Sequence, residues 1–145
     1  MDCRTISQDI IAAFRLKRIL FGTFDSSELN HGLNRTCERI LMMIWHHGTY
    51  AMNELSYDAG LEKGSLTSVI DILEKRGFVS RTRSGTDRRS YLLSATDAGS
   101  RLAGRIDTLF ITHLEHILAA LDEEDRKQFG SAAAIFADCS RKLGS

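Results

Sequence analysis

Arginines gather around one short polar stretch near the middle of the chain. This stretch, Ser84-Gly85-Thr86-Asp87, is flanked by Arg81, Arg83, Arg88 and Arg89. A guanidinium stays charged at neutral pH and donates paired hydrogen bonds to phosphate oxygens. The cluster is therefore suited to an anionic partner with many phosphates, of which a nucleic acid is the commonest.

The elements that carry these arginines are predicted to be two short strands. Phe78–Arg83 alternates enough for a strand with cationic outward side chains, and Ser90–Leu93 returns as its partner. Residues 84–89 join them as the tip of a hairpin, and Gly85 favours a turn there. The arginines thus lie on one small β-hairpin.

A helix with one apolar stripe precedes the hairpin. The stripe has the spacing i, i+3, i+4 and i+7, formed by Leu66, Val69, Ile70 and Leu73. The opposite face holds small or basic side chains suited to base edges or phosphates, namely Lys63, Ser65, Thr67 and Ser68. Gly77 is a signal for the end of this helix, and Asp71 is expected to bond to the hairpin or the backbone rather than to a base. A helix followed by a basic hairpin is typical of a winged helix-turn-helix, which places the helix in the major groove of duplex DNA and the hairpin in the minor groove.

Composition narrows the class of protein. The 145 residues suit a single domain, and the balance of 19 basic and 19 acidic residues gives no overall charge. Basic residues outnumber acidic ones only in the segment from Glu62 to Leu93, where the proposed DNA-contacting elements lie. This local excess favours sequence-specific DNA binding over strongly charged, non-specific binding.

Other signals exclude several classes. No segment is apolar enough to span a bilayer, and the N-terminal run lacks the layout of a signal peptide. The cysteines Cys3, Cys37 and Cys139 are far apart and form no disulfide framework, so we expect a cytoplasmic protein. No Gly-rich phosphate loop, ordered Ser/His/Asp set or paired-carboxylate pattern stands out, so we expect no catalytic residues and no cofactor.

The rest of the chain is predicted to be helical. Helices are expected from about Ile6 to Phe21, from the N-cap Asn34 to Gly48, around Glu54–Tyr57, after the N-cap Thr96 and after Asp122–Asp125. The first helix and the two C-terminal helices carry apolar stripes beyond the needs of one winged helix, with Ile10, Phe14, Leu109, Ile117, Phe129 and Phe136 among them. We therefore expect a mainly α protein with a small β-hairpin wing. It forms one domain, 1–145, in which a winged helix-turn-helix (33–95) is flanked by dimerisation helices (1–32 and 96–145). These helices are expected to join two copies in a symmetric homodimer.

With these residues, the chain resembles the MarR family of transcriptional regulators. The resemblance rests on motifs in family order: Leu33-Asn34 with Ile40-Leu41, Glu54-Leu55, Gly60-Leu61, Ser65-Leu66-Thr67, Leu73-Glu74-Lys75-Arg76-Gly77-Phe78-Val79-Ser80-Arg81, Asp87-Arg88-Arg89 and Thr96-x-x-Gly99. It implies a homodimeric repressor on a pseudo-palindromic duplex, controlled by a small aromatic effector. It also implies that Arg89 enters the minor groove while Asp87 orients it, and that Arg81, Arg83 and Arg88 contact or attract phosphates.

Several alternatives stay open at this stage. An effector pocket between the winged helix and the dimerisation helices is suggested by Phe14, Met42, Trp45 and Phe110, although such residues are more often plain core. The thiol of Cys37 lies in the first turn of a helix, where the helix dipole lowers the pKa of a thiol, so a redox switch is conceivable, with Cys3 near the dimer edge.

Two further alternatives concern metal and partner. His113 and His116 are spaced for zinc on one helix, although His113 also fits a hydrogen-bonded core position. A winged helix used only for protein–protein dimerisation is the rival from another class. It does not require four arginines on the hairpin.

Overall fold

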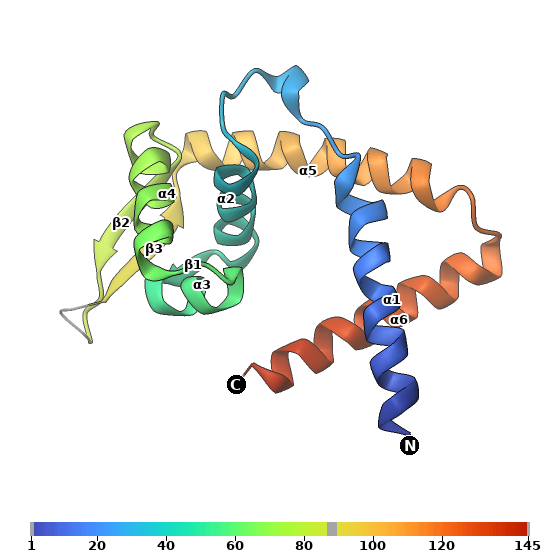
Figure 1. Cartoon of the computed structure of the whole chain (residues 1–145). Coiled ribbons are helices and arrows are strands. Elements are labelled where there is room, and N and C mark those ends of the chain that lie inside the picture. Colours follow the sequence, from blue (N-terminus) through green and yellow to red (C-terminus); the bar gives the residue numbers. More distant parts are fainter. Residues whose placement is uncertain (1, 87–89, 145) are drawn as a thin grey trace. The chain divides into compact units, whose positions relative to one another are not determined.

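The computed structural model describes residues 2–86 and 90–144 (Figure 1). Asp87, Arg88 and Arg89, to which we assigned DNA contacts, lie outside the described residues. The chain divides into two compact units, Asp25–Leu109 and a second unit formed by Met1–Phe24 with Phe110–Ser145. We call them the winged-helix unit and the helical unit.

The winged-helix unit contains helices that the sequence predicted. They are α2 (Arg35–His47), α3 (Met52–Ala59), α4 (Lys63–Lys75) and the first part of α5 (Asp97–Leu118), preceded by a short 3₁₀ turn, η1 (Ser27–Leu29). Asn34 caps α2, since its Oδ1 accepts from the amide of Cys37 at 2.8 Å. Gly77 follows α4 with φ +76°, and the amide of Phe78 bonds back to the carbonyl of Leu73 at 2.9 Å.

The sheet has one strand more than the sequence indicated. Strands β2 (Val79–Arg83) and β3 (Tyr91–Ala95) form the expected antiparallel hairpin. A third strand, β1 (Thr49–Ala51), pairs with the other side of β3, so that the order is β1-β3-β2. The sequence did not indicate β1, because three residues are too few to produce a visible alternation.

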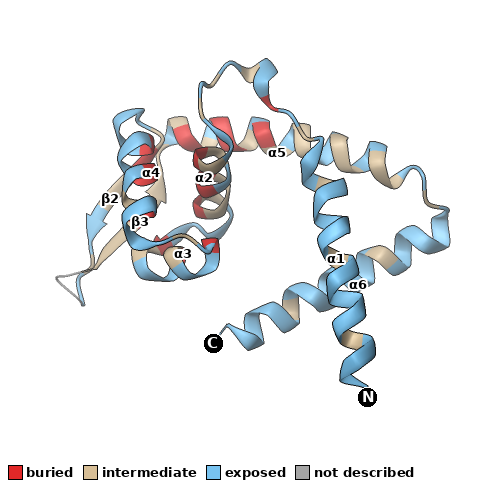
Figure 2. Ribbon diagram, in the orientation of Figure 1, coloured by how far each residue is buried: buried red, intermediate tan, exposed pale blue. Residues whose placement is uncertain are grey.

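The core of the winged-helix unit lies where α2, α4, β3 and the start of α5 meet (Figure 2). Its fully buried side chains include Ile40, Leu41, Ile44, Leu55, Leu66, Ile70, Leu73, Leu93 and Ile106. The stripe predicted for α4 is confirmed, as all four of its members are buried. Burial of this stripe fixes which face of α4 remains available to a partner.

Hydrogen bonds made by Thr96 join the start of α5 to the turn after α4. The hydroxyl of Thr96 donates to the carbonyl of Gly77 at 2.5 Å and accepts from the amide of Gly99 at 3.0 Å. The amide of Thr96 donates to the carbonyl of Phe78 at 3.1 Å. A Cβ at position 99 would lie 1.9 Å from that same carbonyl oxygen, so only glycine allows this approach.

The helical unit consists of α1 (Cys3–Gly22), the end of α5 and α6 (Glu123–Leu143). Helix α1 starts three residues earlier than expected because Asp2 caps it, accepting from the amide of Arg4 at 2.9 Å. Phe21 stacks on Phe110 with ring centroids 5.1 Å apart, and Phe24 meets the same ring edge-on at 5.2 Å. Of the helices described, none has the length and apolar character needed to cross a membrane.

Candidate nucleic-acid interface

The turn between α3 and α4 sets the direction of α4. Gly60 ends α3 in the left-handed region with φ +62°, where a side chain would be strained. The Oγ of Ser56 donates to the carbonyl of Leu61 at 2.7 Å and holds the turn closed. The pair α3 and α4 therefore forms a helix-turn-helix with α4 in the position of the recognition helix.

The exposed face of α4 presents small polar groups. Lys63, Ser65 and Ser68 are exposed and Thr67 is half-buried. The hydroxyls of Thr67 and Ser68 donate to carbonyls one turn back, at 2.8 and 3.2 Å, which leaves their oxygens able to accept. Because these side chains are short, nothing on this face prevents a close approach to a groove floor.

Arg81 joins the wing to the recognition helix. Its Nη2 lies 2.5 Å from Oδ1 of Asp71 and 3.3 Å from Oε2 of Glu74, both on α4. The guanidinium also lies over the ring of Tyr91, 5.6 Å from the centroid. The expectation that Asp71 bonds to the wing is confirmed, and Arg81 is held within the protein rather than extended toward phosphates.

Arg83 lies on the exposed end of β2, beside the hairpin tip. It shares its strand with Arg81, but its cross-strand partner is Tyr91 rather than a carboxylate. Among the described arginines that we expected to contact phosphates, Arg83 is therefore the one that is exposed. Arg88 lies outside the described residues.

The residues suggested for an effector pocket are divided between the two units. Phe14 and Phe110 belong to the helical unit, Phe14 exposed and Phe110 packed against Phe21 and Phe24. Met42 and Trp45 belong to the winged-helix unit and are half-buried on α2. Sequence reasoning missed a different feature, a groove of about 360 Å³ within the winged-helix unit, which none of these four residues lines. Its signal in the sequence is a pair of arginines four residues apart, Arg101 and Arg105.

His113, one of the two histidines considered for zinc, has a partner within the protein, and so have His46 and His47. His113 bonds through Nε2 to the carbonyl of Leu20 at 3.1 Å, so it is hydrogen-bonded as expected, although it is half-buried rather than fully buried. His46 lies 3.5 Å from Asp107, and His47 bonds to the carbonyl of Thr49 at 2.6 Å. No cluster of three or more potential ligands is found among residues 2–86 and 90–144.

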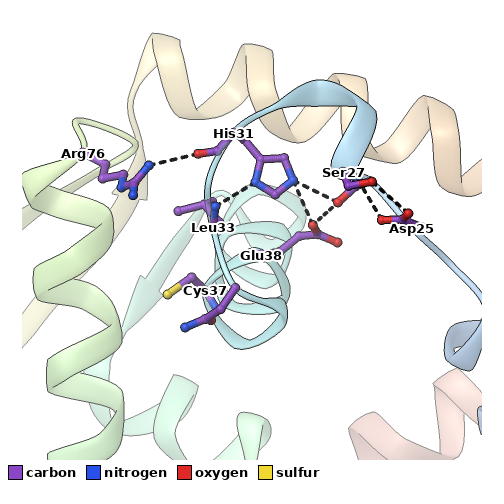
Figure 3. A network of polar contacts seen from close by, with 9 residues as sticks. Asp25, Ser27, His31, Leu33, Cys37, Glu38 and Arg76 are labelled. Atoms are coloured by element: carbon purple, nitrogen blue, oxygen red, sulfur yellow. Dashed lines mark hydrogen bonds and ion pairs between the residues drawn. The ribbon is translucent and has the colours of Figure 1, made fainter.

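His31 organises the segment that precedes α2 (Figure 3). Its Nδ1 accepts from the amide of Leu33 at 3.0 Å, while Nε2 lies 3.2 Å from Glu38 and 2.9 Å from Ser26. The hydroxyl of Ser26 also donates to Glu38. Since the His31 side chain is only 6% exposed, these bonds satisfy a buried polar group and fix the loop against α2.

Cys37 occupies the third position of α2, but it is buried, with 1% of its surface exposed. Burial raises the pKa of the Cys37 thiol, an effect that outweighs the charge of Arg76 and the nearby backbone hydrogen bonds. This burial disfavours the alternative of a redox switch at Cys37, because the charged thiolate is disfavoured away from water.

Iodoacetamide is therefore expected to modify Cys3 and Cys139, which are exposed, long before Cys37. Mass spectrometry of the native protein at pH 8 would measure the order of labelling, with urea-unfolded protein as the control in which all three react. Labelling of Cys37 as fast as Cys3 would contradict its burial.

The described fold and interface are those of a winged-helix protein, and comparison with known proteins gives the family. The family model described as MarR family matches residues 33–91. The HTH-type transcriptional regulator MhqR of Bacillus subtilis (strain 168) is 30% identical over 95 residues, 66% of this chain and 66% of the relative. The match thus spans just under two thirds of that relative's length. The chain belongs to the MarR family.

Two solved structures are similar over most of the chain. The transcriptional repressor CouR, bound to a 23-mer DNA duplex, is 27% identical with a TM-score of 0.69, covering 87% of this chain and 89% of that one. NadR in complex with 4-hydroxyphenylacetate is 24% identical with a TM-score of 0.73, covering 88% and 90%. These matches agree with the winged-helix architecture described above.

Proposed function

We propose that the protein is a homodimeric, sequence-specific DNA-binding regulator that represses transcription and responds to a small effector. The observation that carries this proposal is the short polar face of α4, joined through Arg81 to a wing rich in arginine. In this proposal Lys63, Ser65, Thr67 and Ser68 contact the major groove. Arg83 and Arg88 contact phosphates, and Arg89, oriented by Asp87, enters the minor groove.

The similar proteins support this proposal. CouR is described as a repressor and was solved on a DNA duplex, and MhqR is described as a transcriptional regulator. NadR was solved with 4-hydroxyphenylacetate, which supports control by a small aromatic molecule. We propose that the protein has no catalytic activity and acts in the cytoplasm.

The helical unit supports the homodimer. Neither α1 nor α6 has a buried residue among those described. Large apolar side chains stand exposed on both helices, including Ile10, Ile11, Phe14, Phe21, Ile135 and Phe136. An apolar surface of this kind is rarely left to water, and a second copy of the same helices would cover it.

Analytical ultracentrifugation at micromolar concentration is therefore expected to give a species of twice the 16.2 kDa chain mass. Phe14→Asp with Phe136→Asp should shift the protein toward monomer, since each places a charge in the proposed interface. Lys127→Asp, also on α6 but at a polar position, is the control and should remain dimeric. A wild-type protein that sediments only as 16.2 kDa would rule out the homodimer.

The DNA-binding proposal is tested by selecting bound duplexes from a random pool. We expect a pseudo-palindrome whose half-sites lie about 10 base pairs apart, because a two-fold dimer presents two recognition helices to one face of the duplex. Affinity should fall steeply with salt, as each phosphate contact releases counterions. Selected sites without two-fold symmetry would contradict the dimer model, and no selectable site would contradict DNA binding itself.

The rival function is a winged helix that serves only to hold proteins together. That function does not require the exposed polar face of α4 or the arginines of the wing. Retention on heparin distinguishes the two, since a protein-binding module with no net charge should elute at low salt.

A further inference from the structure

The winged-helix unit has a groove to whose lining α4 contributes no residue. It encloses about 360 Å³ and is lined by Leu29, His31, Phe78, Ala98, Arg101, Leu102 and Arg105. All of these residues belong to the winged-helix unit. The volume is at the lower end of the range for small-molecule sites.

The wall formed by η1 and the residues after it is already fixed in place. The imidazole of His31 is held by Leu33, Ser26 and Glu38, so its ring nitrogens are occupied. The carbonyl of His31 accepts from Nη1 of Arg76 at 3.1 Å, which ties this wall to the end of α4. A ligand would therefore meet a preformed wall and would lose little free energy to ordering it.

The opposite wall carries two positive charges. Arg101 and Arg105 stand one helical turn apart on α5, so their side chains lie on the same face. In the described part of the chain neither guanidinium has an ion pair or hydrogen-bond partner, and no acidic side chain lines the groove. Two like charges at this spacing repel each other, and a doubly charged anion between them would remove that repulsion.

Apolar side chains complete the lining. Leu29 lies on η1, Leu102 on α5 and Phe78 in the turn between α4 and β2, and each contributes an apolar side chain to the lining. The lining therefore combines two guanidinium groups with an apolar surface. This combination fits a small molecule with a doubly charged anionic head and an apolar body.

The groove is also connected to the DNA-contacting elements. Phe78 lies between α4 and β2, and its carbonyl is the one that Thr96 holds and that Gly99 approaches. A ligand that presses on Phe78 would thus act on the turn joining the recognition helix to the wing. Such a ligand changes DNA affinity only if it binds the two arrangements of this turn with different affinities.

We propose that this groove binds a small organic anion with a doubly charged head and an apolar body, and that its occupancy changes DNA affinity. The binding site itself is independent of the function proposed above, whereas the effect on DNA rests on that function. The site differs from the set Phe14, Met42, Trp45 and Phe110.

Three naphthalene compounds test the charge requirement by isothermal titration calorimetry without DNA. Wild-type protein should bind 1-naphthyl phosphate more tightly than 1-naphthoate, and 1-naphthoate more tightly than uncharged 1-naphthol. The double variant Arg101→Gln with Arg105→Gln should weaken binding of 1-naphthyl phosphate about tenfold or more, because two charge-assisted contacts are lost. Arg39→Gln removes an exposed arginine from α2, outside the groove lining, and is the matched control, with an affinity within about twofold of wild type.

A second variant tests the apolar part of the groove. Ala98→Leu keeps both arginines but fills space beside Phe78. It should weaken the binding of each of the three compounds that the wild-type protein binds. Circular dichroism and thermal melting of each variant verify that it folds. Equal binding of 1-naphthyl phosphate by wild type and the double arginine variant would overturn the site, as would failure of the wild type to bind it.

The effect on DNA is measured separately, on the duplex obtained by selection. The affinity of wild-type protein should change when 1-naphthyl phosphate is added, and that of the double variant should not. If the double variant loses DNA affinity without any compound present, the arginines contact DNA phosphates and the regulatory part of the proposal is wrong. If no duplex is bound at all, the proposed function fails while the calorimetric result still decides the site.

Discussion

Gly99→Ala is expected to destabilise the protein by roughly 2–4 kcal/mol, measured by urea unfolding followed by circular dichroism. The added Cβ would lie 1.9 Å from the carbonyl oxygen of Phe78 and 2.8 Å from its carbonyl carbon. Both atoms are backbone, so relief requires α5 to move away from the turn after α4. That movement would also stretch the hydrogen bonds that Thr96 makes to Gly77 and Phe78.

Gly104→Ala is the matched control in the same helix. A Cβ there would be 4.0 Å from Cζ2 of Trp45, an ordinary contact. Because alanine is the better helix former, this variant should be as stable as wild type or more stable by up to about 1 kcal/mol. Equal stability of the two alanine variants would show that the close approach at Gly99 does not exist in solution.

Arg89→Ala is expected to weaken binding to the selected duplex by about 1–3 kcal/mol, with no change in melting temperature. This prediction rests on the sequence, since Arg89 lies outside the described residues. A narrow A·T-rich minor groove concentrates negative potential, and an arginine inserted there gains from it. Asp87→Ala should cause a smaller loss, because it leaves the guanidinium in place but less ordered.

Fluorescence anisotropy of labelled duplex measures both affinities, with thermal melting of each variant to verify folding. Arg141→Ala is the comparison, since Arg141 is an exposed arginine at the end of α6 that pairs with Asp138. It should bind DNA as wild type does. Unchanged affinity of Arg89→Ala would mean that the wing does not contact the minor groove.

Features with local causes were predictable from the sequence. Asn34, Asp122 and Thr96 each cap a helix that begins one residue later, and Gly77 ends α4 in the left-handed region. A cap depends on atoms within three or four residues, so the sequence contains the whole interaction. The apolar stripe of α4 was predictable for the same reason.

Features created by contacts between distant residues were not predictable. The sequence indicated that Asp71 bonds to the hairpin or the backbone, but not that Arg81 is its partner, because that depends on the angle at which β2 leaves α4. The groove beside Arg101 depends on where residues 27–31 pass over α5. The burial of Cys37 belongs to the same group. Its position in the first turn was visible, but the surrounding core that raises its pKa was not.

The place of β3 between two partner strands has a consequence for how the wing unfolds. A hairpin with only two strands is marginally stable in water, whereas here Leu93 pairs with Tyr50 on one side and Arg81 on the other. Tyr50 lies on β1, which follows α2 after Gly48, and its hydroxyl donates to Asp58 on α3. The base of the wing therefore belongs to the same cooperative unfolding unit as the helices beside it, and its strands separate only when that core opens.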